Sequence, residues 1–153
     1  MFMAKVLDGK KLALEIELRL SKDIEVGLKS IHRSPGLALV RVGDDSASGV
    51  YVSNKVRACE RVGIKSFVSH LDSKSSEKEI LNLINKLNKD ENIDGILLQL
   101  PLPRGLNEQV ILEKIDSCKD VDGLTNLNLG KLIKGERAPR SCTPAGIMAL
   151  LSR

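Results

Sequence analysis

Three short strand-like runs alternate with amphipathic stretches in this chain, and this alternation constrains the fold more than any other feature. The runs span residues 37–42, 65–71 and 93–100, and helical spacing of apolar residues precedes the first run and follows each of them. In a chain of 153 residues this suits one domain. The alternation predicts an α/β fold with a mainly parallel open sheet and helices on both faces, a three-layer α/β/α arrangement.

The first amphipathic stretch predicts a long helix. Asp8 is a plausible N-cap, and Ser34-Pro35-Gly36 ends the stretch. Apolar residues recur every four positions between these ends, and we expect them to form one buried stripe. They are Leu12, Ile16, Leu20, Ile24 and Leu28.

Other boundaries follow from local signals. The run 93–100 is the most apolar and predicts a central strand that Pro101 stops. Ser76 and Glu79 have capping-box spacing. Thr143-Pro144 predicts an N-cap with proline at the first helical position.

The second helix, which follows the turn after the first strand and ends at Gly63, carries the most suggestive pair of side chains. Ser46 or Ser48 can cap this helix, and Gly63 is a good left-handed C-cap. Tyr51 and Lys55 lie four residues apart, so both side chains leave the same helix face. Most such pairs in proteins are solvated surface, so the pair needs partners before it indicates a site.

Candidate partners come from sheet topology, because ligands of open parallel sheets bind outside the carboxyl ends of the strands. Gln99 ends the third strand, and a polar loop with Asp120 and Asp122 returns to the same edge. A lysine in a partly desolvated cleft can exchange protons near neutral pH, and an uncharged amide can orient it. A carboxylate such as Asp122 can accept two hydrogen bonds from an amino-pyrimidinone edge.

Structural explanations of these residues stay open at this point. Gln99 could cap a strand end, Asp122 could form an Asx turn before Gly123, and Lys55 could be solvated.

Composition narrows the partners. Net charge is +4, from 24 basic and 20 acidic residues, and aromatic residues make up 2%, so no basic surface interleaved with aromatics is available for nucleic acid. A mildly positive cleft for a small anion fits better. The three cysteines and two histidines have no metal-ligand spacing, so we expect no metal and no disulfide. Early charges argue against a signal peptide, and no apolar run is long enough for a membrane partner, so we expect a cytoplasmic protein.

Two enzyme classes fit poorly. The Tyr51–Lys55 spacing matches the catalytic pair of short-chain dehydrogenases, but the chain has no Gly-x-Gly-x-x-Gly and no Walker A loop. A stand-alone α/β hydrolase would need a Gly-x-Ser-x-Gly elbow, which is also missing from the sequence.

Four segments, in order and in register over the whole chain, resemble one known family. The sequence is similar to bifunctional methylenetetrahydrofolate dehydrogenase/methenyltetrahydrofolate cyclohydrolase. The four segments are residues 42–64 with Tyr51 and Lys55, residues 94–103 with Gln99, residues 119–124 with Asp122, and residues 142–146. Family members usually have proline where Ser46 and Ser141 stand, which affects local rigidity rather than chemistry.

The resemblance implies two reactions of one-carbon metabolism and purine biosynthesis at one tetrahydrofolate site. NADP-dependent oxidation converts 5,10-methylenetetrahydrofolate to the methenyl form, and hydrolysis gives 10-formyltetrahydrofolate. Lys55 would be the general acid/base, Tyr51 would stack on or position the folate ring, and Gln99 would tune and orient the lysine. The backbone around Leu98 to Leu100 would line the pocket, and Asp122 would bind the pterin edge.

Length is the largest departure from the family. Residues 1–153 correspond to its folate-binding catalytic domain, and the Rossmann domain that holds NADP is absent, so we expect a truncated chain whose cofactor residues would lie beyond Arg153. Such a fragment should lack dehydrogenase activity, whereas the full-length protein is expected to be a homodimer. The alternative is a non-catalytic folate-binding or interaction module that lacks the cofactor half.

Overall fold

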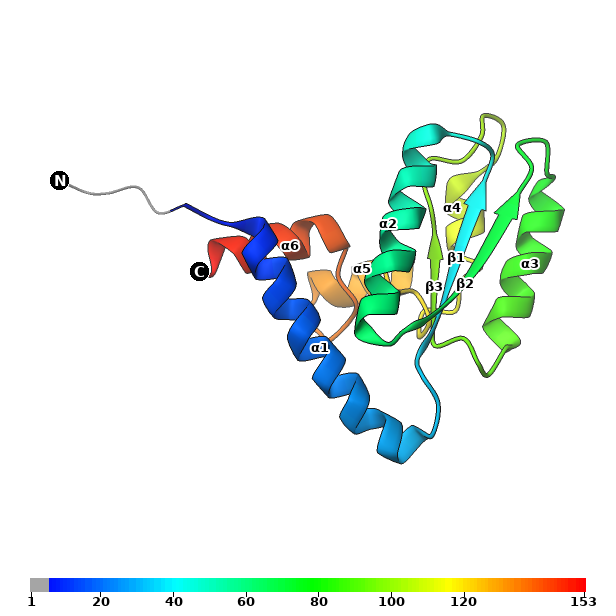
Figure 1. Ribbon diagram of the computed structural model, residues 1–153. Helices are drawn as coiled ribbons and strands as arrows, with labels where there is room; N and C mark the ends of the chain where they lie inside the picture. Colours follow the sequence, from blue (N-terminus) through cyan, green and yellow to red (C-terminus); the bar gives the residue numbers. More distant parts are fainter. Residues whose placement is uncertain (1–5) are drawn as a thin grey trace.

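The computed structural model describes residues 6–153. These residues form six helices and three strands, in the order that the sequence predicts (Figure 1). The elements are α1 (Gly9–Ile31), β1 (Gly36–Val42), α2 (Ser46–Val62), β2 (Lys65–Leu71), α3 (Glu77–Lys89), β3 (Gly95–Leu98), α4 (Glu108–Leu112), α5 (Asn126–Ile133) and α6 (Cys142–Leu151).

The three strands form one parallel sheet in the order β2-β1-β3. The central strand is therefore β1, and the prediction that residues 93–100 form the central strand is wrong. All four residues of β3 are buried, which explains the error. A continuous apolar run indicates that both faces of a strand are covered, but it does not indicate whether the strand has one neighbouring strand or two.

Alternating residues of β1 face two different layers, as a pleated strand requires. Ala38, Val40 and Val42 pack in one cluster with α3 and α4, whereas Leu39 packs in a second cluster with Val52 of α2. Helix α2 covers one face of the sheet and helices α3 and α4 cover the other (Figure 1). The predicted three-layer α/β/α fold is confirmed.

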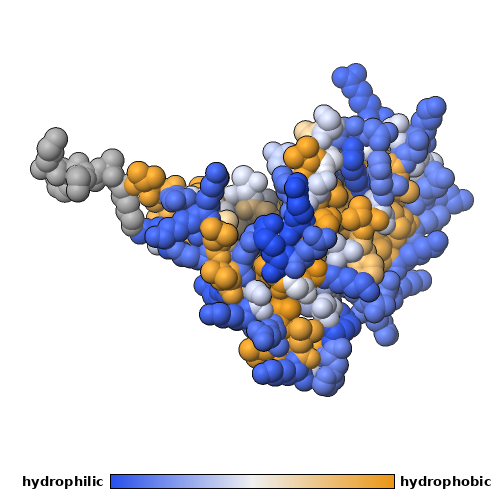
Figure 2. All heavy atoms as spheres, in the orientation of Figure 1, coloured by the Kyte–Doolittle hydropathy of each residue, from blue (hydrophilic) through white to orange (hydrophobic). Residues whose placement is uncertain are grey.

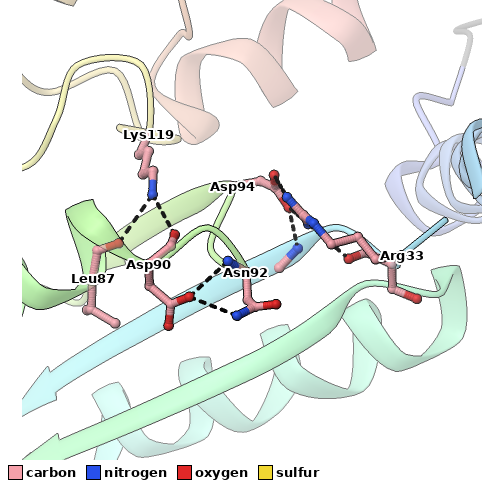
Figure 3. Close-up of polar contacts among 8 residues, drawn as sticks. Arg33, Leu87, Asp90, Asn92, Asp94 and Lys119 are labelled. Carbon is pink, nitrogen blue, oxygen red and sulfur yellow. Dashed lines mark hydrogen bonds and ion pairs between the residues drawn. The ribbon is translucent and has the colours of Figure 1, made fainter. Parts of the chain in front are cut away.

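A polar network joins the amino ends of β1 and β3 (Figure 3). The carboxylate of Asp94 accepts hydrogen bonds of 2.6 and 2.8 Å from the Arg33 guanidinium and one of 2.7 Å from the N–H of Gly36. On the same side, the Nζ of Lys119 donates to the carbonyl oxygens of Leu87 and Asp90. These contacts fix the starts of the strands, whose far ends then meet at the opposite edge.

Helix α1 departs from its prediction. Asp8 caps it as expected, and Oδ1 of Asp8 accepts a hydrogen bond from the N–H of Lys11. Of the predicted stripe only Ile24 is buried, while Ile16 and Leu20 are each 39% exposed. The helix runs outside the sheet and contacts α2, and hydrophobic side chains reach the surface along it (Figures 1 and 2). Helical spacing predicts a stripe, but only a neighbouring element can bury it.

Of two further predicted helix starts, one is confirmed and one is wrong. Ser76 and Glu79 form the predicted capping box at α3. Helix α6 begins at Cys142 with Ser141 in the N-cap position, so the predicted cap at Thr143 is wrong. The backbone enters the helix earlier than a cap at Thr143 would require, and Pro144 still falls in the first turn, where its missing N–H costs no intrahelical hydrogen bond.

Candidate active site

Helix α2 carries the candidate lysine and begins directly after the turn that closes β1. Its N-cap is Asp45, whose Oδ1 accepts a hydrogen bond of 2.7 Å from the N–H of Ser48. The predicted cap at Ser46 or Ser48 is therefore wrong, because the carboxylate just before the helix reaches the free N–H groups. Gly63 ends the helix in the left-handed conformation, with φ of 86°, as predicted.

Lys55 of α2 and Gln99 of the β3 end are in direct contact. The Nζ of Lys55 donates to Oε1 of Gln99 at 2.8 Å, and Nε2 of Gln99 donates to the carbonyl oxygen of Leu100 at 2.7 Å. The second bond turns the amide so that its oxygen faces the lysine. Both side chains are partly buried. The structure therefore brings two of the predicted site residues together in one oriented pair.

The backbone around Gln99 is held by the sheet and by the core. The N–H of Gln99 bonds to the carbonyl of Val40 at 2.8 Å, which extends the ladder one residue past the end of β3. The side chains of Leu98 and Leu100 pack in the core cluster with α3 and α4. These two leucines can therefore line a pocket next to Lys55 only with their backbone, in agreement with the role that the family resemblance implies.

Asp122 lies in a loop that is held on both sides. Before it, the side chain of Asp120 is buried, and its Oδ2 accepts bonds from the N–H and hydroxyl of Thr125 and from Nδ2 of Asn128. A parallel bridge between Ile96 and Asp120 makes the chain leaving Asp120 run in the direction of β3. Asp120 is thus a structural residue, and it leaves Asp122 as the carboxylate for the site.

The environment of Asp120 keeps its carboxylate charged. Burial acts to raise the pKa of Asp120, but the hydrogen bonds from Thr125, Asn128 and the backbone N–H of Leu124 outweigh burial and hold the pKa below its ordinary value. The charge of Asp120 stabilises the loop itself, because all three donors lie on the segment that follows Asp120.

Gly123 lets the chain before α6 approach this loop. Its φ is +64°, and a Cβ atom at this position would lie 2.4 Å from the carbonyl oxygen of Pro139. No other residue fits without a shift of backbone. The close approach brings the start of α6, and with it Cys142, to the side of Asp122.

Cys142 contacts Asp122, one of the site residues that the sequence predicts. Its Sγ lies 3.0 Å from Oδ1 of Asp122, and the thiol donates this hydrogen bond. Burial raises the pKa of the Cys142 thiol to about 11, helped by the hydrogen bond and the charge of Asp122 and opposed by the charge of Lys55.

Tyr51 is the most open member of the predicted set. It lies one turn before Lys55 on α2, and 61% of its surface is exposed. Within the part of the chain that the structure describes, the side chain of Tyr51 makes no hydrogen bond. Its ring is therefore free to contact a ligand that sits beside Lys55.

Sequence reasoning assigned no role to Cys142, although the residue lies in one of the four family-like segments. No spacing could have paired it with Asp122, because 20 positions separate the two residues and a further helix, α5, lies between them. The available signal was Gly123, since a glycine at a positive φ permits close backbone approach.

Residues 6–153 hold no cluster of metal-ligand side chains and no membrane-spanning helix. No three His, Cys, Asp or Glu side chains gather there in a way that could hold a metal ion. No helix in the same range is long and apolar enough to cross a membrane.

Comparison with known proteins supplies the family context. The family model for "Tetrahydrofolate dehydrogenase/cyclohydrolase, catalytic domain" matches residues 7–122. The bifunctional protein FolD of a Prochlorococcus marinus strain is 61% identical over 151 residues, which cover 99% of this chain and 50% of that protein. The chain spans about half the length of the curated relatives it matches.

Solved structures agree with this match. The bifunctional FolD methylenetetrahydrofolate dehydrogenase/cyclohydrolase from Campylobacter jejuni has a TM-score of 0.93 and 45% identity, and the match covers 97% of this chain and 52% of that one. The methylenetetrahydrofolate dehydrogenase-cyclohydrolase (FolD) of Trypanosoma brucei, solved with NADP cofactor and inhibitor, has a TM-score of 0.94 and 30% identity, covering 99% and 52%.

Proposed function

This chain belongs to the tetrahydrofolate dehydrogenase/cyclohydrolase family, and on that premise we propose that it supplies the folate site and the catalytic lysine of a bifunctional enzyme of one-carbon metabolism. Its substrates would be 5,10-methylenetetrahydrofolate and 5,10-methenyltetrahydrofolate. The 2.8 Å contact between Lys55 and Gln99 carries this proposal, because an oriented amine beside an open helix face is suited to moving a proton at a bound ligand.

In the hydrolytic step, water adds to the methenyl carbon that bridges N5 and N10 of the folate. The amine of Lys55 accepts the proton that the attacking water loses. The bond from this carbon to N5 then breaks, and the lysine ammonium returns a proton to N5. As the C=O bond of the formyl group forms, the remaining hydroxyl proton passes to solvent, so the positive charge of the methenyl group leaves as one released proton. The products are 10-formyltetrahydrofolate and the lysine in its starting form, so one residue serves as base and then as acid.

The other site residues bind and orient the ligand. Gln99 holds the amine through Oε1 while its own amide is fixed on Leu100. Asp122 would accept hydrogen bonds from the amino-pyrimidinone edge of the pterin, and Tyr51 would stack on the ring system. The backbone from Leu98 to Leu100 would form the wall between them. A mildly basic chain, with net charge +4, also suits an anionic folate.

NADP would supply the hydride acceptor for the oxidation, but residues 6–153 do not fit it. The turn after β1 has one glycine, Gly43, and its open side is filled by Pro103 and Ser73. The N-terminus of α2 that follows is already capped by Asp45. No phosphate cradle results, so other residues of the whole protein would have to hold NADP, and no hydride step is derived from these.

The remaining proposals rest on the family resemblance. Residues 1–153 would be the folate-binding catalytic domain of a cytoplasmic protein, and the whole protein would be a homodimer. A non-catalytic folate-binding module is the second candidate. The Lys55–Gln99 contact favours catalysis over this alternative, because binding alone needs no lysine oriented by an amide.

Methenyl hydrolysis by this chain tests the proposal directly. We expect loss of the near-ultraviolet absorbance of 5,10-methenyltetrahydrofolate faster than in a protein-free blank, and Lys55→Met should reduce the rate by about 10²–10⁴-fold. Folate binding, followed by calorimetry, should be largely kept in the same variant. The matched control is Lys86→Met on α3, a lysine far from the site in the chain. Full turnover by the Lys55 variant would remove its catalytic role, and binding without turnover by wild type would favour the module.

A further inference from the structure

Cys142 is the first residue of α6 and contacts Asp122 of the candidate site. Its thiol donates a hydrogen bond to Oδ1 of Asp122 at 3.0 Å. Within residues 6–153, no other group donates a hydrogen bond to the Asp122 side chain. The orientation of this carboxylate therefore depends on one thiol that comes from a different element of the fold.

The position of the thiol is built into the backbone. Gly123, next to Asp122, lies against the carbonyl of Pro139, and the chain then enters α6 at Cys142. A Cβ atom on Gly123 would meet Pro139 and the backbone nitrogen of Arg140. The Asp122 loop and the start of α6 are thus held together by backbone contact, and the thiol–carboxylate bond forms within that contact.

The protonation state of the thiol suits a donor and not a base or nucleophile. Cys142 is exposed as a residue, but its thiol is partly desolvated, and this desolvation, followed by the hydrogen bond and the negative charge of Asp122, raises its pKa to about 11. The thiol therefore keeps its proton at neutral pH. A thiolate would face the carboxylate with like charge and would lose the hydrogen bond.

An aspartate held by one oxygen presents the other to a ligand. Oδ1 accepts from the thiol, and Oδ2 has no partner within the described range. Lys55 lies close enough for its charge to act on the same thiol. The thiol therefore leaves Oδ2 as the free oxygen of Asp122.

We propose that Cys142 is a positioning residue, which fixes the carboxylate of Asp122 through its S–H donor so that the free oxygen faces the folate beside Lys55. This inference rests on the proposed function, because it names Asp122 as the group that binds the pterin. It adds a residue that acts through Asp122 and makes no contact of its own with the reacting atoms.

The first test compares folate affinity in two variants of Cys142, measured by calorimetry with folic acid. Cys142→Ala removes the donor and should weaken binding by about threefold to tenfold, in the range of one neutral hydrogen bond. Cys142→Ser keeps a donor at the same position and should restore affinity to within about twofold of wild type. The rate constant of methenyl hydrolysis at saturation should be the same in both, since Lys55 is untouched. The matched control is Cys118→Ala, at the other exposed cysteine.

The second test needs no ligand. In a Cys118→Ser background, with Cys59 buried, iodoacetamide should report on Cys142. Asp122→Asn removes the charge that opposes thiolate formation, so alkylation at a mildly alkaline pH should become faster than in the parent. An unchanged alkylation rate would overturn the contact itself, whatever the activity of the protein.

The outcomes separate this inference from the function on which it rests. If Asp122→Ala weakens folate binding and Cys142→Ala does not, the positioning role is wrong and the folate site stands. If Asp122→Ala also leaves affinity unchanged, Asp122 is not the pterin ligand and both proposals fall. If Cys142→Ser binds as weakly as Cys142→Ala, the side chain matters for packing and the donor role is wrong.

Discussion

The Nζ of Lys55 lies 2.8 Å from Oε1 of Gln99, although the residues are 44 positions apart in the chain. Lys55 lies on the helix that follows β1, and Gln99 is the residue directly after β3. The two strands are parallel neighbours, so the contact is a consequence of sheet topology. Lys55 is partly buried there, and Tyr51, one turn earlier on α2, is 61% exposed.

Removing the Gln99 amide should impair catalysis more than binding. In Gln99→Ala the amine of Lys55 loses the acceptor that fixes it, and misplacement of a catalytic group by about 1 Å can cost about a hundredfold in rate. We expect methenyl hydrolysis to fall by about tenfold to a hundredfold, with folate affinity within about threefold of wild type. Steady-state hydrolysis and calorimetry measure the two quantities, with Gln109→Ala on α4 as the control. A larger loss of affinity than of rate would mean that Gln99 binds the ligand instead.

The charge of Asp122 should matter for folate binding. Asp122→Asn keeps the shape of the side chain but turns one acceptor into a donor and removes the charge, so hydrogen bonding of this side chain to the pterin edge would be weakened. Charge-assisted bonds contribute about 1.5–3 kcal/mol, which corresponds to a loss of affinity of about tenfold to a hundredfold. Calorimetric titration with folic acid tests this, and Asp23→Asn on the exposed side of α1 is the control. Equal affinity in the two variants would contradict the pterin contact.

Local and periodic signals explain how much of the fold could be predicted. The sequence predicts Asp8, Ser76 and Gly63 as helix ends because a cap acts within one turn, and the structure confirms all three. The exposure of α1 could not be predicted, since burial depends on whether another element covers the stripe. The prediction that β3 is the central strand was wrong for a similar reason, because strand order depends on pairing between segments that are distant in the sequence.

In the candidate site, one contact could be predicted from the sequence and another could not. The Lys55–Gln99 pair followed from a general rule for parallel sheets, which needs only the order of strands and helices. Cys142 was not predicted, because its contact with Asp122 depends on the close approach of Gly123 to Pro139. That approach is a contact between two irregular segments, and neither the periodicity of apolar residues nor the spacing of motifs can predict such a contact.

Gly123 should be intolerant of a side chain. In Gly123→Ala the new Cβ would lie 2.4 Å from the Pro139 carbonyl oxygen at a φ of +64°. The positive φ costs about 1 kcal/mol, and the overpacked contact adds roughly 1–3 kcal/mol to the loss of unfolding free energy. Urea unfolding measures the total, and we expect weaker folate binding because Asp122 and Cys142 move apart.

Gly135→Ala is the matched control for this prediction. Gly135 has a φ of +72° and no atom within 4 Å of a built Cβ, so it reports the cost of the positive φ alone. If the two alanine variants unfold at the same urea concentration, the contact between Gly123 and Pro139 does not hold the loop to α6.

The Arg33–Asp94 pair should make stability depend on acid pH. Hydrogen bonds from Arg33, with a smaller one from the N–H of Gly36, hold the pKa of Asp94 below its ordinary 3.8 against the opposing effect of burial. A lowered folded-state pKa means that stability is present above the ordinary value and is lost as the pH falls through the folded-state value. Asp94→Asn should therefore destabilise the protein at neutral pH and have a smaller effect once the pH lies below the folded-state pKa, when measured by urea unfolding. The Asp94 side chain is 46% exposed, so solvent and salt screen the pair and the difference should shrink in about 1 M salt. Glu25→Gln on α1 is the control, and an equal effect of Asp94→Asn at both pH values would show that the pair does not stabilise the amino ends of β1 and β3.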